Sequence, residues 1–149
     1  MVNVSRPAVI ADMDGTLVDV SGIRHHVTGP ERDFAAFHAA SIDCPPNPGV
    51  VAEVREHAAL GRDVVVVTSR SRRWERLTSM WLALHDVPTD ALFMRRDGDY
   101  RPDVEVKRDI LAGIRRRWDV RHAIDDNPAV IALWREAAIP VSVVPGWPG

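Results

Sequence analysis

Two carboxylates separated by one residue, Asp12 and Asp14, are the first feature of the sequence that could do chemistry. They follow the apolar run Ala8–Ala11 and precede Gly15. Such a run predicts a buried parallel strand, and ligands of open α/β sheets bind beyond the carboxyl ends of strands. The two negative charges repel each other, so the pair favours a hard cation beside a carboxylate that is able to act as a nucleophile.

The same spacing also occurs in calcium loops and in ordinary turns. A calcium loop needs further oxygen ligands and a Glu within the same twelve residues. The apolar residues Leu17, Val18 and Val20 follow instead, so a calcium loop fits poorly. A purely structural turn stays open as the alternative to a catalytic one.

Polar side chains follow two further apolar runs. Val64–Val67 leads into Thr68-Ser69-Arg70, and Val120–Ile124 leads into Asp125-Asp126. Because the carboxyl ends of parallel strands meet at one edge of a sheet, we expect these groups to converge with the first pair of carboxylates. A hydroxyl and backbone amides at the start of a helix form a phosphate cradle, to which an arginine adds a bidentate fork.

Four acidic groups would then lie close together, and without a cation they would destabilise one another. A divalent metal is therefore expected, and Mg²⁺ fits because all the ligands are oxygens. Lys107 is the only lysine in the chain, and we expect it to neutralise either a phosphate or the crowded carboxylates.

The rest of the chain alternates strand and helix patterns. The expected strands are Ala8–Ala11, Val64–Val67, Ala91–Met94, Val120–Ile124 and Val141–Val144. The expected helices are Glu31–Ala40, Gly49–Leu60, Arg72–His85, Val104–Arg117 and Pro128–Ala137. This alternation predicts an α/β fold, a doubly wound parallel sheet with helices on both faces. The connection between the first two strands leaves room for a small cap at most.

Punctuation residues set several of these boundaries. Asn47 and Asn127 are expected to cap helices that begin at the prolines following them, and Gly61 is expected to end one. Phe34 and Phe37 are expected on one side of a short helix, and the third helix is expected to bury a stripe of apolar residues, namely Trp74, Leu77, Trp81 and Leu84.

Length and composition predict one domain over residues 1–149. The formal net charge of −2 excludes a global basic field for nucleic acid but leaves a local patch open. Cys44 is alone, which excludes an internal disulfide framework. Neither a signal peptide nor an apolar run of membrane-spanning length is visible, so we expect a cytoplasmic protein without a membrane partner.

The sequence resembles the haloacid dehalogenase-like phosphatase superfamily. The four motifs that carry this resemblance occur in order: Asp12-Met13-Asp14-Gly15-Thr16, Thr68, Lys107 and Asp125-Asp126. The resemblance implies that Asp12 attacks phosphorus and that Asp14 serves as general acid and then general base. It implies that Thr68 and Lys107 hold the transferring phosphoryl group. It also implies that Asp12, Asp14 through its carbonyl, and Asp125 or Asp126 bind Mg²⁺.

A closer resemblance is to the phosphatase domain of phage and bacterial polynucleotide kinase-phosphatases. It rests on Val65–Arg70, Gly98–Arg101, Val106-Lys107 and Ala123–Asp126. It implies a Rossmann-like fold of the haloacid dehalogenase type that removes 3′-phosphates from DNA or RNA ends. The family's pattern has glycine where Ser69 stands and often arginine where Asn127 stands, which bears on the geometry of the loop after the second strand.

The resemblance also implies residues that contact the substrate, which are Thr16, Arg24, Ser69, Arg70, Arg95 and Arg101. A solvated loop arginine is an equal alternative for Arg24. No nucleotide-binding Gly-x-x-x-x-Gly-Lys-Ser/Thr motif occurs, so the kinase half is missing. The chain is then either an excised domain or a stand-alone phosphatase, to which a separate kinase or ligase is a candidate partner. Homo-oligomerisation stays open.

Three functions remain in view from the sequence. The first is an Mg²⁺-dependent polynucleotide 3′-phosphatase that works through an aspartyl-phosphate. The second is a phosphatase of small metabolites or nucleotides. The third belongs to a different class, a non-catalytic module that binds nucleic-acid ends within a repair protein.

Overall fold

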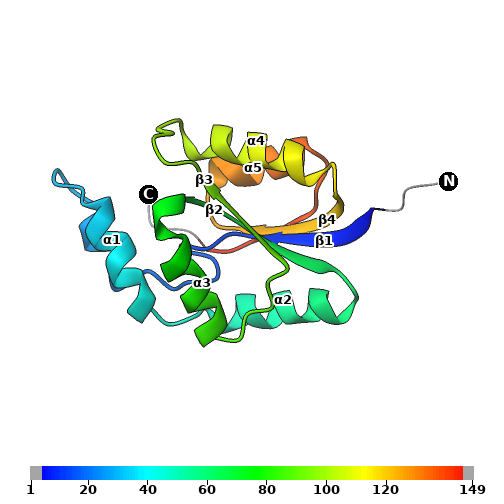
Figure 1. Ribbon diagram of the computed structural model, residues 1–149, viewed down its shortest axis with the longest axis horizontal. Coiled ribbons are helices and arrows are strands. Elements are labelled where there is room, and N and C mark those ends of the chain that lie inside the picture. The colour runs from blue at the N-terminus through cyan, green and yellow to red at the C-terminus, as the bar shows by residue number, and fades with distance from the viewer. Residues whose placement is uncertain (1–4, 146–149) are drawn as a thin grey trace.

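The computed structural model describes residues 5–145 and shows a parallel sheet between two helical layers (Figure 1). The strands are β1 Arg6–Ala11, β2 Asp63–Ser71, β3 Ala91–Arg95, β4 Trp118–Asp125 and β5 Val141–Val143. Their order across the sheet is β3-β2-β1-β4-β5, and each neighbouring pair is parallel. The doubly wound α/β fold predicted from the alternating patterns is confirmed.

The helices lie in two layers and at one edge of the sheet. They are α1 Phe34–Ala40, α2 Pro48–Ala59, α3 Glu75–Leu84, α4 Asp103–Ile114 and α5 Pro128–Glu136, with 3₁₀ turns η1 Arg24–His26, η2 Ser41–Asp43 and η3 Arg72–Trp74. In Figure 1, α4 and α5 cover one face of the sheet and α2 and α3 cover the other. The short helix α1 stands apart from both layers, at the side of the sheet away from the N-terminus.

Strand β2, which lies between β3 and the central strand β1, is buried on both faces. Successive side chains of a strand point to opposite sides, so its four valines divide between the two layers. Val64 and Val66 pack in the core that includes Trp81 of α3, whereas Val65 and Val67 pack in the core that includes Trp134 of α5. Each of these valines is fully buried, as the run of β-branched residues predicted.

The predicted helix boundaries are largely confirmed. Asn127 caps α5 by accepting a hydrogen bond from the Ala129 amide. Asn47 stands at the N-cap position of α2 with Pro48 in the first turn, but its side chain makes no capping hydrogen bond there. Gly61 follows α2 with a φ of +83°, a left-handed conformation that glycine adopts without strain.

Two details of the helices differ from the predictions. The first helix begins at Phe34 rather than Glu31, because Asp33 serves as its N-cap and accepts from the Ala36 amide at 2.9 Å. Its two phenylalanines also differ in exposure, since Phe37 is buried whereas Phe34 is 56% exposed.

The predicted apolar stripe of α3 is only partly confirmed. Trp81 is buried as predicted, together with Thr78 and Leu82, whereas Leu84 is 67% exposed. Residues 72–74 form the 3₁₀ turn η3, and the α-helix begins only at Glu75. The buried Thr78 hydroxyl accepts a hydrogen bond from Arg70 near the end of β2.

Within residues 5–145, no helix combines the length and the apolar character that crossing a membrane requires.

At the opposite edge of the sheet from the carboxyl ends of the strands, Asp63 joins three strands. Its carboxylate accepts two hydrogen bonds of 2.7 Å from the Arg6 guanidinium of β1 and one of 2.9 Å from the Trp118 indole of β4. These donors lower the pKa of Asp63 from its ordinary value of 3.8 to about 2.

We predict that Asp63→Asn lowers the free energy of unfolding at pH 7 by about 1 kcal/mol, because the charged hydrogen bonds are replaced by neutral ones. A carboxyl group with a lowered folded-state pKa stabilises the protein above pH 3.8 and loses this effect as the pH falls through 2. Urea unfolding at pH 7 and pH 3 measures the difference. A gap between wild type and variant that is equal at both pH values would contradict the assignment.

Candidate active site

A cleft of about 1550 Å³ opens at the carboxyl edge of the sheet. Residues that follow β1, β2 and β4 line it, together with residues of α1, of α4 and of the loop between β3 and α4. Asp12, Asp14, Thr68, Lys107 and Asp126 all belong to this lining. Side chains from four separate parts of the sequence therefore meet in one place, where the parallel strands end.

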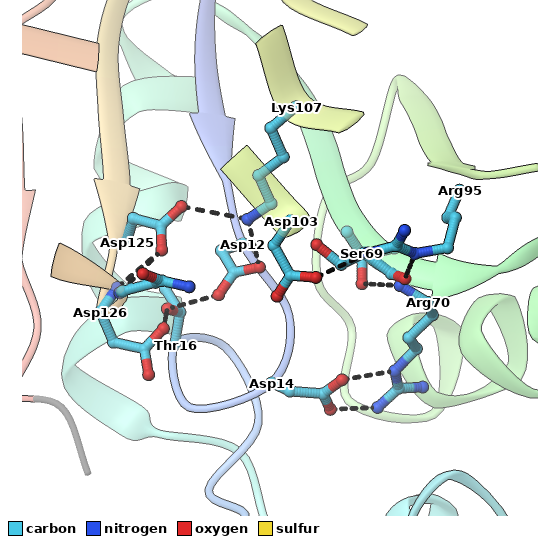
Figure 2. A network of polar contacts seen from close by, with 12 residues as sticks. Asp12, Asp14, Thr16, Ser69, Arg70, Arg95, Asp103, Lys107, Asp125 and Asp126 are labelled. Carbon is cyan, nitrogen blue, oxygen red and sulfur yellow. Dashed lines mark hydrogen bonds and ion pairs between the residues drawn. The ribbon is translucent and has the colours of Figure 1, made fainter. Parts of the chain in front are cut away.

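The buried ammonium of Lys107 lies between two carboxylates (Figure 2). Its Nζ donates to Oδ1 of Asp12 at 2.8 Å and to Oδ2 of Asp125 at 3.1 Å. All three side chains are nearly excluded from solvent. Lys107 therefore ties α4 to the ends of β1 and β4, and the nearby carboxylates raise its pKa above the ordinary value.

A single ammonium leaves this cluster with excess negative charge. The Thr16 hydroxyl lies 3.1 Å from Oδ2 of Asp12 and 3.2 Å from Oδ1 of Asp126, yet it has only one proton to share between them. Burial and the charge of Asp125 raise the pKa of Asp12 well above its ordinary value. Burial also raises the pKa of Asp126.

The cluster fits a divalent cation. One carboxylate oxygen from each of Asp12, Asp125 and Asp126 lies within 4.8 Å of the others. All these atoms are hard oxygen donors, and the excess charge is what a bound Mg²⁺ would neutralise.

Asp125 and Asp126 differ in how many hydrogen bonds their carboxylate oxygens already accept. Oδ1 of Asp125 accepts from the amides of Asp126 and Asn127, and Oδ2 accepts from Lys107 and from the Trp134 indole. The Asp126 carboxylate accepts from Thr16, and it lines the cleft. Asp126 is therefore the better placed of the two to bind a cation directly.

Asp14 is held apart from this cluster by Arg70. The guanidinium donates from Nε to Oδ2 of Asp14 at 2.9 Å and from Nη2 to Oδ1 at 2.5 Å, a bidentate pair (Figure 2). Nη1 of Arg70 donates to the Thr78 hydroxyl, which in turn donates to the Trp74 carbonyl. Arg70 is almost fully buried, so this chain fixes where the Asp14 carboxylate lies.

The residues expected to contact substrate divide into two groups. Thr68 and Ser69 line the cleft, and the Ser69 hydroxyl is buried without a hydrogen-bond partner in the described chain. The Thr68 hydroxyl accepts from the Arg70 amide at 3.2 Å and keeps its proton to donate. Both side chains therefore have hydrogen bonds available for a ligand.

The arginines expected to bind substrate are mostly engaged elsewhere. Four N–H groups of Arg95 donate to protein, namely to the carbonyls of Ser69, Asp99 and Arg101 and to the Asp103 carboxylate. Arg101 forms ion pairs with Asp99 and Asp109. These two arginines line the cleft but stiffen the loop between β3 and α4 instead of offering a free fork.

Arg70, Thr16 and Arg24 also differ from the sequence-based expectation. Arg70 directs its guanidinium at Asp14, not into open space. Thr16 hydrogen-bonds within the acidic cluster, and Arg24 lies in η1, outside the lining of the cleft. The reason is local pairing: a buried guanidinium or hydroxyl takes the nearest acceptor that the fold presents.

The residues that hold the side chains of the site in position were not predicted from the sequence. Three further residues hydrogen-bond to side chains of the site, but none of them directly follows a predicted strand in the sequence. They are Thr78, Trp134 and Asp103. Thr78 and Trp134 lie on helices packed over the strand ends, so only the packing of the helices reveals them.

A second cluster of possible ligands, Glu53, His57 and His122, lies on α2 and β4 outside the cleft. Arg62 is a donor only, so Nδ1 of His57 accepts from it at 2.7 Å. The neutral ring then carries its proton on Nε2, which lies 3.5 Å from the Glu53 carboxylate. This tautomer turns a proton toward Glu53 in place of a lone pair, so the cluster is suited to joining α2 to the sheet.

The comparison with known families covers nearly all of the chain. Residues 6–146 match the family described as the polynucleotide kinase PNKP phosphatase domain. The solved structure of a Pnkp1/Rnl/Hen1 complex contains a chain with a TM-score of 0.81 and 27% identity, over 94% of this chain. That match covers 46% of the other chain, and it covers 42% in a structure of the Pnkp1/Rnl/Hen1 RNA repair complex, so this chain spans less than half of those relatives.

More distant solved structures share the fold. The class C acid phosphatase from Bacillus anthracis with tungstate bound has a TM-score of 0.67 and 13% identity, over 97% of this chain and 69% of that one. D,D-heptose 1,7-bisphosphate phosphatase from B. bronchiseptica, complexed with magnesium and phosphate, has a TM-score of 0.54 and 21% identity, over 93% and 79%. These matches show that the fold is shared.

We predict that Mg²⁺ stabilises the protein through Asp126. At about 100 times its dissociation constant, a ligand adds about 2.7 kcal/mol, which corresponds to a rise in Tm of about 5–10 °C for a chain of this size. Asp126→Asn should abolish most of that rise and should itself raise the Tm in metal-free buffer, because it removes one of the crowded charges. Differential scanning calorimetry with and without Mg²⁺ measures both effects.

The control is Asp119→Asn, which removes an exposed carboxylate paired with Arg121 at the start of β4. It should leave the Mg²⁺-induced rise unchanged. An equal loss of the rise in both variants would mean that the ion acts by general screening and not at the cluster.

Proposed function

The chain belongs to the family of the polynucleotide kinase PNKP phosphatase domain, and from that premise we propose that it is an Mg²⁺-dependent phosphomonoesterase that removes 3′-phosphates from DNA or RNA ends. The observation that carries the proposal is the pair of carboxylates at the end of β1. Asp12 is tied to Lys107, and Asp14 is tied to Arg70. Two equivalent carboxylates are thereby given separate environments, as a nucleophile and a general acid–base group require.

In the first half of the reaction, a carboxylate oxygen of Asp12 attacks phosphorus. The bond from phosphorus to the 3′ oxygen breaks, and Asp14 gives its proton to that leaving oxygen. The product is an aspartyl-phosphate on Asp12 and a free 3′-hydroxyl. Lys107 keeps the Asp12 carboxylate oriented throughout, because its ammonium is fixed to Oδ1.

In the second half, Asp14 takes a proton from a water molecule that attacks the same phosphorus. The bond from phosphorus to Asp12 breaks, inorganic phosphate leaves, and Asp14 is protonated again for the next cycle. Thr68 and Ser69 have hydroxyl protons to donate to the phosphoryl oxygens, on which negative charge spreads during the transfer.

Asp12, Asp126 and the carbonyl of Asp14 are the groups we assign to Mg²⁺, with Asp125 holding Lys107 beside them. A bound Mg²⁺ would neutralise charge on the phosphoryl oxygens and on the nucleophile.

The width of the cleft supports a large substrate. A volume of about 1550 Å³ exceeds what a phosphate group alone requires, and helix α1 is the main element that extends beyond the sheet at this edge. The chain similar to this one in the Pnkp1/Rnl/Hen1 RNA repair complex supports nucleic-acid ends as the substrate and a kinase or ligase as a partner. Small phosphorylated metabolites remain the second candidate, because an open cleft admits them too.

We predict that the protein releases phosphate from a 3′-phosphorylated oligonucleotide in the presence of Mg²⁺, and that it acts far less on the same oligonucleotide phosphorylated at its 5′ end. Chelation with EDTA should abolish turnover. A panel of 3′-phosphate, 5′-phosphate and free nucleotide substrates measures this. Activity confined to free nucleotides or small phosphomonoesters would favour the metabolite phosphatase.

Asp12→Asn should lower kcat by at least about 1000-fold, because the amide is not a nucleophile, while binding of the oligonucleotide persists. Phosphate release and fluorescence anisotropy on the same protein give the two readouts. Failure of the wild type to turn over any phosphomonoester, with binding retained, would instead identify a non-catalytic end-binding module.

Arg70→Lys should lower kcat by about 10- to 100-fold, because the lysine keeps the charge but not the bidentate hold on Asp14. The loss should be larger for a 3′-phosphate than for para-nitrophenyl phosphate, whose leaving group needs little protonation. Arg101→Lys is the matched control and should change neither substrate by more than about twofold. An equal loss on both substrates would show that Arg70 acts on the phosphoryl group itself.

A further inference from the structure

Three side chains form an aromatic wall on one side of the cleft: Phe34 and His38 of α1, and Trp74 of η3. Phe34 and His38 are four residues apart, so they share one face of the helix. The rings of His38 and Trp74 lie 5.7 Å apart. Segments separated by a whole strand in the sequence thus present a joint π surface beside the catalytic carboxylates.

The wall is unusually open for apolar residues. Phe34 is 56% exposed, although the neighbouring Phe37 of the same helix is buried. Trp74 is only half-buried. Exposed aromatic rings gathered in a cleft are typical of sites that bind a flat apolar ligand, since the ring area stays available for contact.

The wall also carries no charge at neutral pH. Burial lowers the pKa of His38 to about 4, which outweighs the opposite effect of the nearby Asp14 carboxylate. The neutral imidazole leaves its Nδ1 buried without a hydrogen-bond partner in the described chain. Asp14, the proposed general acid–base group, lines the same cleft as His38.

Positive charge lies at the wall itself. The Arg73 guanidinium lies over the Trp74 ring, 5.0 Å from its centre, and Arg32 lines the same cleft. An uncharged flat surface beside exposed guanidinium groups complements a nucleotide, in which a flat base is joined to an anionic backbone. A phosphorylated sugar or a phosphopeptide would use the arginines but would leave the ring area unmatched.

Resting on the proposed function, we propose that the aromatic wall of Phe34, His38 and Trp74 stacks the nucleobase of the terminal nucleotide, so that the protein recognises a base-bearing end whatever its sequence. Stacking is tolerant of sequence because every base has a π face. Tyr100, 94% exposed in the loop between β3 and α4, lines the same cleft and stands ready as a further ring surface. The wall positions the end, and the carboxylates act on its phosphate.

The test measures kcat and KM for two substrates, a 3′-phosphorylated oligonucleotide and para-nitrophenyl phosphate. Trp74→Ala keeps the backbone carbonyl that accepts from Thr78, so the hydrogen bonds that hold Arg70 and Asp14 stay in place. The variant should raise KM for the oligonucleotide by about 5- to 150-fold, the loss expected for one stacked base, and should leave para-nitrophenyl phosphate within about twofold. Trp74→Phe should restore most of the affinity. Phe34→Ala should act in the same direction, while its matched control Met80→Ala, 57% exposed on α3 outside the cleft, should have no effect.

A second arm changes the substrate. An oligonucleotide whose terminal 3′-phosphorylated residue is abasic should bind the wild type as weakly as the normal substrate binds Trp74→Ala, and the variant should show no further loss on it. A Trp74→Ala penalty that is equal with and without the terminal base would overturn the stacking proposal, as would an equal fall for para-nitrophenyl phosphate. Efficient, Trp74-dependent turnover of a phosphoserine peptide would overturn it as well.

The two proposals fail in distinguishable ways. Turnover of the 3′-phosphorylated oligonucleotide that is indifferent to the wall and to the terminal base removes the stacking proposal and leaves the phosphatase intact. Absence of turnover on that oligonucleotide, with para-nitrophenyl phosphate still hydrolysed, removes the polynucleotide substrate and the stacking proposal together.

Discussion

The ammonium of Lys107 is the interaction on which the rest of the site depends. It reaches from α4 to carboxylates at the ends of β1 and β4, and it is buried with them. Buried charges are costly unless they are paired, and here one cation serves a cluster of three acids. The fold therefore holds together a group of charges that it only partly neutralises, and the remaining negative charge suits the cluster to a divalent cation.

Arg70 solves a related problem for the other carboxylate. Because its guanidinium grips both oxygens of Asp14, the two acids at the end of β1 do not share one cation. Arg70 is itself held by Thr78 of α3, whose buried hydroxyl accepts from Nη1 of the guanidinium. A side chain from a helix that packs on the sheet thus helps to fix the position of the proposed general acid.

The sequence was sufficient for the frame of the fold and for the place of the site. Apolar runs that end in polar residues located the strand ends, and Gly61 and Asn127 located helix boundaries, because each depends on neighbouring residues alone. The sequence did not reveal which groups the arginine side chains contact. Arg70 and Arg95 were expected to face substrate, but each pairs with an acceptor that only the folded chain brings near.

Side-chain exposure on the helices escaped prediction for a similar reason. Apolar periodicity shows which residues share a side of a helix, but not how far the rest of the fold covers that side. Leu84 at the end of α3 is 67% exposed, and Phe34 at the start of α1 is 56% exposed although Phe37 of the same helix is buried. Exposed apolar side chains that sequence patterns do not predict are typical of functional sites, and Phe34 lines the proposed one.

The indole of Trp134 is at once a central member of the packing between α5 and the sheet and a hydrogen-bond donor to Asp125. The hydrophobic core and the charged cluster therefore share one side chain. Thermal unfolding of the core therefore also removes the Trp134 hydrogen bond from Asp125, the carboxylate that accepts from Lys107. We expect loss of activity and loss of tertiary structure to occur together, without an active, partly unfolded intermediate.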